Sequence, residues 1–303
     1  MKATALVTPV LIAGCIIVML SFAVRAAFGI FQIPVAEEFG WLRAEFSMAI
    51  AIQNLFWGIG QPIFGAIAEK VTDRKAITLG GLVYSLGLVL SSYAVTPGAM
   101  HADGILIGFG IAGTGLGVIL AVVGRATSDE HRSMALAIAT AAGSVGQVIG
   151  APLAEYLLGV MSWQHVFIIF AAIIIGSLIF LPMMKTERVA SRSELEESIS
   201  EVLIKAFKDP SYTLIFLGFF SCGYQLGFIT AHFPAFVTEL CGPILPGGAL
   251  YSIGITTTSR LGALAISLIG LANIVGTLAA GYLGKHYLKK YLLAGIYMAR
   301  TVV

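Results

Sequence analysis

The sequence predicts an all-α integral membrane protein, built as a helical bundle with about eight or nine membrane-spanning helices. Of its 303 residues, 58% are hydrophobic and only 11% are charged, and the mean hydropathy is +0.93. A soluble domain is typically about 45–50% apolar and about 25% charged. The apolar residues also fall into runs of about 20, the length that a helix needs to cross about 30 Å of hydrocarbon.

The runs of apolar residues give the expected spans in order along the chain. They cover residues 8–33, 46–67, 76–95, 104–126, 133–158, 164–184, 211–238 and 259–283, and a ninth begins at Tyr291. Glycines four residues apart suit close packing of helices, and they occur as Gly104 with Gly108, Gly113 with Gly117, and Gly146 with Gly150. We therefore expect one polytopic bundle rather than isolated anchors.

Basic residues are strongly biased to one side of the expected membrane. If the N-terminus is cytoplasmic, nearly all loop Lys and Arg residues lie on the inner side, and the outer loops carry only Arg43 and Arg260. Positive charge in short loops favours the cytoplasmic side. We therefore expect a multi-pass protein of the cell inner (plasma) membrane with its N-terminus in the cytoplasm.

Residues 185–210 form the longest polar connection and divide the chain. Within it Leu195, Ile199, Leu203 and Phe207 are four apart, which predicts an amphipathic helix at the inner membrane surface. The expected domains are an N-terminal six-helix bundle (1–184), a cytoplasmic linker (185–210) and a partial C-terminal bundle with helices seven, eight and the start of nine (211–303).

Composition and motifs argue against an enzyme. The net charge of +2 gives no basis for a nucleic-acid partner, and the three cysteines lack the spacing of metal ligands. A G-x-G-x-x-G pattern from Gly108 to Gly113 lies inside an apolar helix with no preceding strand, so it does not indicate a dinucleotide site. We expect no catalytic residues, no cofactor and no metal.

Two loops repeat one pattern. "GAIAEKVTDRK" begins at Gly65 and "GYLGKHYLKK" begins at Gly281, and Arg74 and Lys290 each lie nine residues after their glycine. The loops follow the second and eighth expected spans, so the repeat unit is six helices. Parallel repeats of six helices are a feature of one class of secondary transporters.

With these loops the sequence resembles the major facilitator superfamily. The signature of that family between helices two and three is a glycine, an acid four residues later and then basic residues, here Gly65, Glu69, Lys70, Arg74 and Lys75. The resemblance implies a major-facilitator-type bundle of two six-helix halves, in which this loop is a gating motif that holds one access state. Thr72 replaces the usual glycine of the loop. The family expects twelve spans, so we expect either a fragment or a truncated product.

The stretch "FAVRAAFGIFQIPVAEEFGWLRAEFS", from Phe22 to Ser47, points to one group of carriers within that superfamily. It is similar to bacterial relatives of the monocarboxylate transporters and oxalate/formate antiporters. The resemblance implies a secondary active carrier of a small organic anion, a mono- or dicarboxylate, that works by alternating access with coupling to protons or a counter-anion. A basic residue of helix one is tied to translocation in such carriers, and Arg25 matches it. Asn273 and Thr277 stand where helix eight usually carries Asp and Arg, so binding would depend mainly on Arg25.

Arg25 also stands out from the residues alone. It lies about 12 Å from the outer end of the first span, and Gln53 and Asn54 fall at nearly the same depth on the second. A guanidinium between amides suits a carboxylate. Three interpretations stay open: a substrate ligand, a structural pair with an acid such as Glu155, and snorkelling toward the headgroups.

Other polar residues near the midplane are weaker candidates for substrate binding: Gln147, Tyr224, Gln225 and Asn273. His232 and Glu155 are candidates for proton coupling. Each of these has a plain alternative as an interhelical hydrogen-bonding group. The expected partners are an anionic small molecule and the lipid bilayer, and the oligomeric state is not predicted. The alternatives in function are a carrier of another small solute with Arg25 structural, and a truncated remnant that does not transport.

Overall fold

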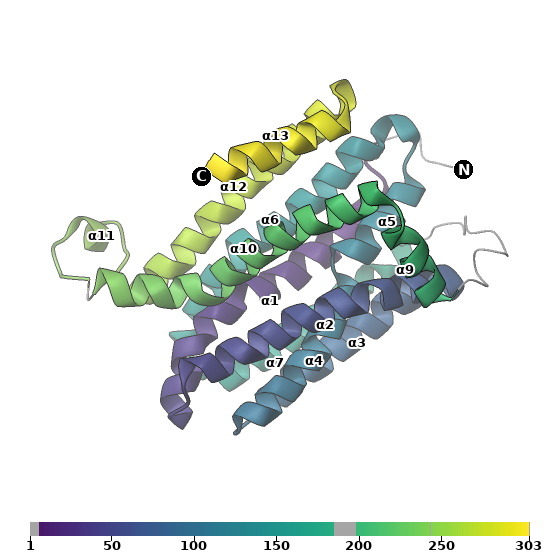
Figure 1. Cartoon of the computed structure of the whole chain (residues 1–303). Helices are drawn as coiled ribbons and strands as arrows, with labels where there is room; N and C mark the ends of the chain where they lie inside the picture. The colour runs from purple at the N-terminus through teal and green to yellow at the C-terminus, as the bar shows by residue number, and fades with distance from the viewer. Residues whose placement is uncertain (1–5, 185–197, 243, 303) are drawn as a thin grey trace.

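A computed structural model describes residues 6–184, 198–242 and 244–302. Every regular element in these ranges is a helix, and the long helices lie side by side in one bundle (Figure 1). The expected all-α fold is confirmed.

The helices follow the expected order. In the first half they are α1 (Pro9–Phe39), α2 (Arg43–Lys70), α3 (Asp73–Ser91), α4 (Pro97–Thr114), α5 (Leu116–Ala126), α6 (Asp129–Leu158), α7 (Trp163–Ser177) and the short 3₁₀ helix η1 (Leu178–Met183). After them come α9 (Ile199–Phe207), α10 (Pro210–Cys241), α11 (Ala249–Ser252), α12 (Thr258–His286) and α13 (Lys289–Val302).

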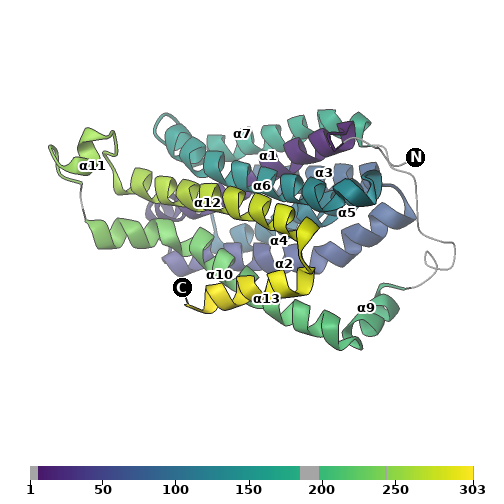
Figure 2. The same ribbon diagram turned by 90° about the horizontal axis from the view of Figure 1, so that it is seen from above.

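The bundle has two ends, which we name by a residue at each. The Gly40 end holds the α1–α2 turn, and the Arg74 end holds the α2–α3 turn. The short α11 lies beyond the Gly40 end, whereas α9 lies at the Arg74 end (Figures 1 and 2).

Six helical segments among the described residues are long and apolar enough to cross a membrane. They are Pro9–Phe39, Pro97–Ala126, Asp129–Leu158, Trp163–Met183, Pro210–Cys241 and Thr258–His286. Helices α2 and α3 occupy the places expected for spans 46–67 and 76–95, but neither meets that hydropathy criterion. Polar residues such as Gln53, Asn54 and Gln61 lower the hydropathy of α2. That α2 and α3 cross a membrane stays a prediction.

Local sequence sets the limits of these helices. The hydroxyl of Thr8 accepts a hydrogen bond from the backbone N–H of Leu11 at 3.0 Å, which caps the start of α1. Gly40 ends α1 with a φ of 65°, a left-handed conformation that glycine adopts without strain. Gly115 separates α4 from α5, and a side chain there would meet the carbonyl of Ile111.

Glycines bring helix backbones close together, as their spacing predicted. A Cβ atom on Gly146 would overlap the carbonyl of Met19, and one on Gly150 would overlap that of Ala23, so α6 packs directly on the backbone of α1. Gly104, Gly108 and Gly113 also lie against the backbones of neighbouring helices, whereas Gly117 lies against the side chain of Gln61.

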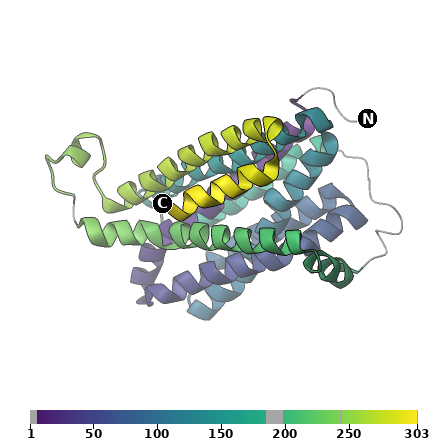
Figure 3. The ribbon, with the colours of Figure 1, turned by 45° about the horizontal axis from the view of Figure 1, so that its top comes forward.

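Helix α12 packs along α6, as Figure 3 shows. Near the middle, the hydroxyl of Ser267 donates to the carbonyl of Val148 at 2.8 Å, and Gly270 lies against Ser144. Toward the Arg74 end, the hydroxyl of Ser133 donates to the carbonyl of Gly281 at 3.1 Å. Residues more than 100 positions apart therefore join the first half of the chain to the second.

Helix α10 meets the first half mainly at the Gly40 end. Gly29 of α1 lies against the backbone of Thr230 and Ala231 and the ring of Pro234, so the two helices are in direct contact there. Toward its start α10 is exposed, for example at Leu214 and Phe219.

The structure covers only part of the predicted linker. Helix α9 coincides with the second half of the expected amphipathic segment, and Phe207 packs edge-on against Tyr212 of α10. Leu195 and the rest of 185–197 lie outside the described residues. The division into domains 1–184, 185–210 and 211–303 stays a prediction.

Candidate functional site

Arg25 lies on the buried face of α1, with 7% of its surface exposed. Its guanidinium donates a hydrogen bond from an Nη atom to Oδ1 of Asn54 at 3.1 Å. The Nδ2 atom of Asn54 in turn donates to the carbonyl of Ile50 at 2.9 Å, which fixes the amide so that its oxygen faces the arginine. Asn54 is therefore the amide neighbour of Arg25 that the depth of the two helices predicted.

Two aromatic rings cover the guanidinium. The Cζ atom of Arg25 lies 4.7 Å from the ring centre of Trp57 and 5.8 Å from that of Phe22. The two rings contact each other edge-on, with centres 5.9 Å apart. The face of an aromatic ring stabilises a cation by about 0.5–2 kcal/mol through the ring quadrupole, without an oxygen acceptor for its N–H groups. The charge is thus held in place while most of its N–H groups stay unused by neighbouring side chains.

No acid forms an ion pair with Arg25 among the described residues. Glu155, the acid suggested as a structural partner, lies at the Gly40 end of α6 and faces α12. It accepts hydrogen bonds from Ser259 at 3.0 Å and Thr257 at 3.3 Å, and Nε of Arg260 is 3.8 Å away. Glu155 is therefore the partner of the start of α12 and not of Arg25.

Two further buried donors lack a hydrogen-bond partner in the described part of the chain, one of them on the Trp57 side chain that covers Arg25. They are Nε1 of Trp57 and Nε2 of Gln147. Gln147 lies on α6 between Gly146 and Gly150, which face α1, and Ser144 and Val148, which face α12. At about 100° per residue its side chain points between these two helices.

The predicted residues Gln53, Tyr224 and Gln225 differ in their surroundings. Gln53 is buried on the side of α2 that faces α4, where it lines a cavity of about 10 Å³ with Phe28. Tyr224 and Gln225 are exposed on α10, just before Gly227. A Cβ atom added to Gly227 would lie 3.9 Å from Nδ2 of Asn54. Both therefore lie within about one helical turn of the level at which α10 passes Asn54.

Asn273 and His232 lie on the second half of the described chain. Asn273 is exposed on α12, about 60° around the helix from Gly270. The ring of His232 packs against Phe228 of α10 with centres 5.2 Å apart. Neither contacts Arg25, and their roles in binding and proton coupling stay predictions.

The loop motif joins helix ends at the Arg74 end. Arg74 donates from Nη2 to the carbonyl of Pro182 at 2.7 Å and from Nε to that of Met184 at 3.3 Å. These bonds satisfy carbonyls at the end of η1, which have no partner within a helix. Gly65 is half-buried, and three other residues of the motif, Glu69, Lys70 and Lys75, are exposed.

Some residues of these sites were missed from the sequence. Trp57 is three residues after Asn54 and therefore on the same face of α2, a spacing that could have pointed to it. Asp73, which no sequence pattern indicated, is buried and forms an ion pair with Arg125 at the end of α5. Tyr84 is fully buried and donates to the carbonyl of Ser21 at 3.4 Å.

Comparison of the sequence with models of known protein families agrees with this all-helical fold. The family model described as Major Facilitator Superfamily matches residues 14–302. The chain belongs to the major facilitator superfamily. Membership confirms the resemblance seen in the sequence, and it makes this chain a member of a family of membrane transporters rather than of enzymes.

Several curated members of the superfamily are similar to this chain. The uncharacterised MFS-type transporter YcxA of Bacillus subtilis (strain 168) is 27% identical, over 76% of this chain and 59% of YcxA. Monocarboxylate transporter 13 of Rattus norvegicus is 26% identical, over 88% of this chain and 58% of that protein. Monocarboxylate transporter 12 of Homo sapiens is 22% identical, over 93% and 58%. The chain therefore spans about three fifths of the length of these relatives.

A solved structure shares the superfamily fold. It is the crystal structure of a bacterial homologue of the human lysosomal transporter Spinster, in an inward-facing and unoccupied conformation. The TM-score is 0.54 at 16% identity, and the match covers 95% of this chain and 78% of the other. At that identity the likeness concerns the fold alone.

Proposed function

We propose that this chain belongs to a secondary active transporter of the plasma membrane that carries a small organic anion, with Arg25 as the main ligand. The observation that carries the proposal is a buried guanidinium with no acid paired to it in the described residues. An uncompensated buried charge is costly, so Arg25 would be most stable with an anion beside it.

The neighbours of Arg25 favour a carboxylate as that anion. The guanidinium presents parallel N–H donors that match the two oxygens of a carboxylate. The free Nε1–H of Trp57 and the amide of Gln147 offer further hydrogen bonds from α2 and α6. The names of two relatives, both monocarboxylate transporters, support the same substrate class.

Transport would follow from the way the two parts of the chain meet. Arg25, Asn54 and Trp57 belong to α1 and α2, while Tyr224 and Gln225 of α10 lie near the same level. Binding of an anion across these helices would favour one tilt of α10 against the first half, which is the basis of alternating access. His232 and Glu155 remain our candidates for a coupled proton, with a counter-anion as the other driving force.

Uptake by the reconstituted protein tests the role of Arg25. We expect Arg25→Gln to lower uptake of radiolabelled lactate into liposomes about 10- to 150-fold, since a hydrogen bond to a charged group contributes about 1.5–3 kcal/mol. The matched control is Lys205→Gln, which removes an exposed positive charge from α9, away from the bundle core. Normal lactate uptake by Arg25→Gln would contradict the proposal.

The alternative is a carrier of another solute in which Arg25 is structural. The contacts to Asn54, Trp57 and Phe22 favour it, because they hold the cation without a substrate. The two roles differ in the effect of ligand on stability. A ligand anion raises the thermal midpoint of the wild-type protein and not of Arg25→Gln, whereas a structural arginine predicts a lower midpoint with no dependence on the anion.

A further inference from the structure

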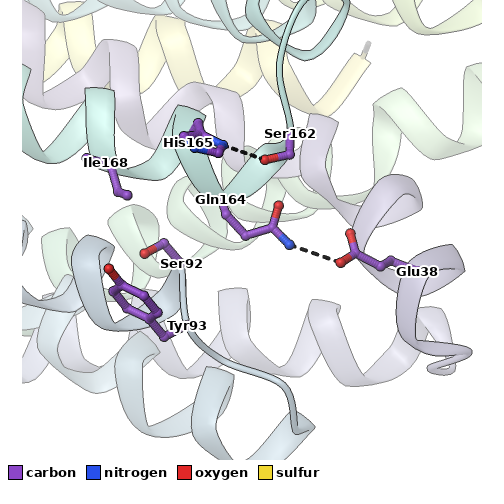
Figure 4. A pocket seen from close by; sticks show the side chains of 7 residues that line it. All are labelled: Glu38, Ser92, Tyr93, Ser162, Gln164, His165 and Ile168. Carbon is purple, nitrogen blue, oxygen red and sulfur yellow. Dashed lines mark hydrogen bonds between the residues drawn. The ribbon is translucent and has the colours of Figure 1, made fainter.

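A hollow of about 560 Å³ lies at the Gly40 end, between the end of α3 and the start of α7. In Figure 4, Ser92 and Tyr93 lie on one side of it and the α7 side chains on the other, with Glu38 of α1 at one end. Its lining residues are Glu38, Ser92, Tyr93, Ser162, Gln164, His165 and Ile168. None of them belongs to the Arg25 site.

One corner of the hollow accepts hydrogen bonds and carries negative charge. The two carboxylate oxygens of Glu38 accept from Nε1 of Trp163 at 2.5 Å and from Nε2 of Gln164 at 3.0 Å. Both donors are neutral, and no cation pairs with Glu38 in the described part of the chain. The Oε1 atom of Gln164 is buried without a hydrogen-bond partner there. This corner is therefore suited to a cation with several N–H groups, such as a primary ammonium.

Donors lie on both sides of the same hollow. The Nδ1 atom of His165 is 2.7 Å from the hydroxyl of Ser162. When that hydroxyl donates, Nε2 of His165 carries the ring proton and is a donor. Tyr93 is 72% exposed as a residue, and its hydroxyl is a second donor. Together they suit an anionic group such as a phosphate diester a few ångströms from the ammonium.

The hollow continues into an apolar surface. Ile168 also lines a neighbouring hollow of about 480 Å³, together with Met161 and Ile169. Further from the Gly40 end, exposed aliphatic side chains continue the row on each helix: Leu90 and Leu86 on α3, and Ile175 on α7. Their spacing of four and seven residues keeps each row on one face of its helix. A polar pocket above two aliphatic rows matches a molecule with a charged head and a hydrocarbon tail.

We propose that this hollow binds a phospholipid with a primary-ammonium headgroup. The ammonium donates to Glu38, the phosphate accepts from Tyr93 and His165, and one acyl chain lies along Ile168 and the leucines of α3. A soluble amine would use the polar corner alone and leave the aliphatic rows uncovered. The site is independent of the anion proposed at Arg25.

Lipid titration of the purified protein in detergent, read by native mass spectrometry, tests the proposal. The probes are phosphatidylethanolamine, phosphatidylcholine, whose headgroup has no N–H donor, and free ethanolamine. We expect Glu38→Gln to weaken binding of phosphatidylethanolamine about tenfold or more, because a charge-assisted hydrogen bond is lost. The matched control is Glu37→Gln, which removes the same charge from the adjacent exposed residue and should bind like the wild type.

A second variant separates lipid binding from folding. Ile168→Trp fills the hollow and leaves both hydrogen bonds of Glu38 in place, so it should lose the lipid while keeping the thermal midpoint of the lipid-free protein. Equal binding of phosphatidylethanolamine by Glu38→Gln and wild type would overturn the proposal. So would equal affinity for phosphatidylcholine, or displacement of the lipid by an equimolar amount of free ethanolamine.

Discussion

A methyl group added at Gly270 tests how the two parts of the chain are joined. In Gly270→Ala the new Cβ atom would lie 2.8 Å from Cγ2 of Val148 and 3.0 Å from the carbonyl oxygen of Ser144. Ordinary contact for a Cβ atom begins at 3.4 Å. The carbonyl oxygen of Ser144 must therefore move by 3.4 − 3.0 = 0.4 Å, and Cγ2 of Val148 by 3.4 − 2.8 = 0.6 Å. The carbonyl belongs to the backbone of α6, so α12 itself has to shift.

The expected cost follows from the general effect of overpacking, about 1–3 kcal/mol. A glycine-to-alanine change in a helix also stabilises the helix by roughly 0.5–1 kcal/mol. Gly276→Ala separates these effects, because it lies in the same helix and its Cβ atom would have no atom within 4 Å. We therefore expect Gly270→Ala to be about 1–3 kcal/mol less stable than Gly276→Ala.

Thermal unfolding of both variants in detergent, followed by tryptophan fluorescence, measures the difference. Gly276→Ala should unfold at or above the midpoint of the wild type, and Gly270→Ala below it. If Gly270→Ala unfolds at the same temperature as Gly276→Ala, the close contact between α6 and α12 does not hold the two parts together and the reasoning is refuted.

Two further predictions concern the Arg74 end. Arg74→Ala removes both hydrogen bonds to the end of η1 and should destabilise the protein by about 1–2 kcal/mol, whereas Lys75→Ala, at an exposed neighbour, should leave the thermal midpoint unchanged. In α9 the backbone N–H of Ser198 donates to Glu201 at 2.9 Å, which lowers the pKa of Glu201 below its ordinary value of 4.5. Because the lowered pKa belongs to the folded state, this capping stabilises α9 above pH 4.5 and is lost as the pH falls through the lowered pKa. Amide exchange in α9 should therefore be faster, relative to an unfolded reference, at about pH 3 than at about pH 6. Glu201→Gln should remove the difference, and an unchanged difference in that variant would contradict the assignment.

Helix geometry alone predicted part of the site. The rise per residue placed Asn54 at the depth of Arg25, and the hydrogen bond between them confirms that neighbour. Gln53 was equally deep but faces α4, since adjacent residues on a helix point about 100° apart. Depth is readable from the sequence, whereas the direction of a side chain requires the packing of the helix.

Contacts between distant helices were not readable in the same way. Glu155 pairs with the start of α12, more than 100 residues later, although the sequence left Arg25 open as its partner. Asp73 and Arg125 are joined across the ends of α3 and α5, and each lies at the end of an expected span, where a loop charge facing solvent is an equally good interpretation. A single sequence contains no signal for which of several charges meet across helices.

The contact of Gly29 with α10 also has a mechanical consequence. From Thr230 to Pro210 the helix extends about 30 Å, and its contact with α1 lies near Thr230. Thr230 is closer to Cys241 than to Pro210, so a tilt of α10 by about 10° with this contact as the fulcrum displaces Pro210 by roughly 5 Å. Asn54 meets α10 at Gly227, within one turn of the fulcrum. A sub-ångström shift of α10 at Gly227, about 4.5 Å from the fulcrum, would thus be amplified about sevenfold at Pro210, by geometry alone.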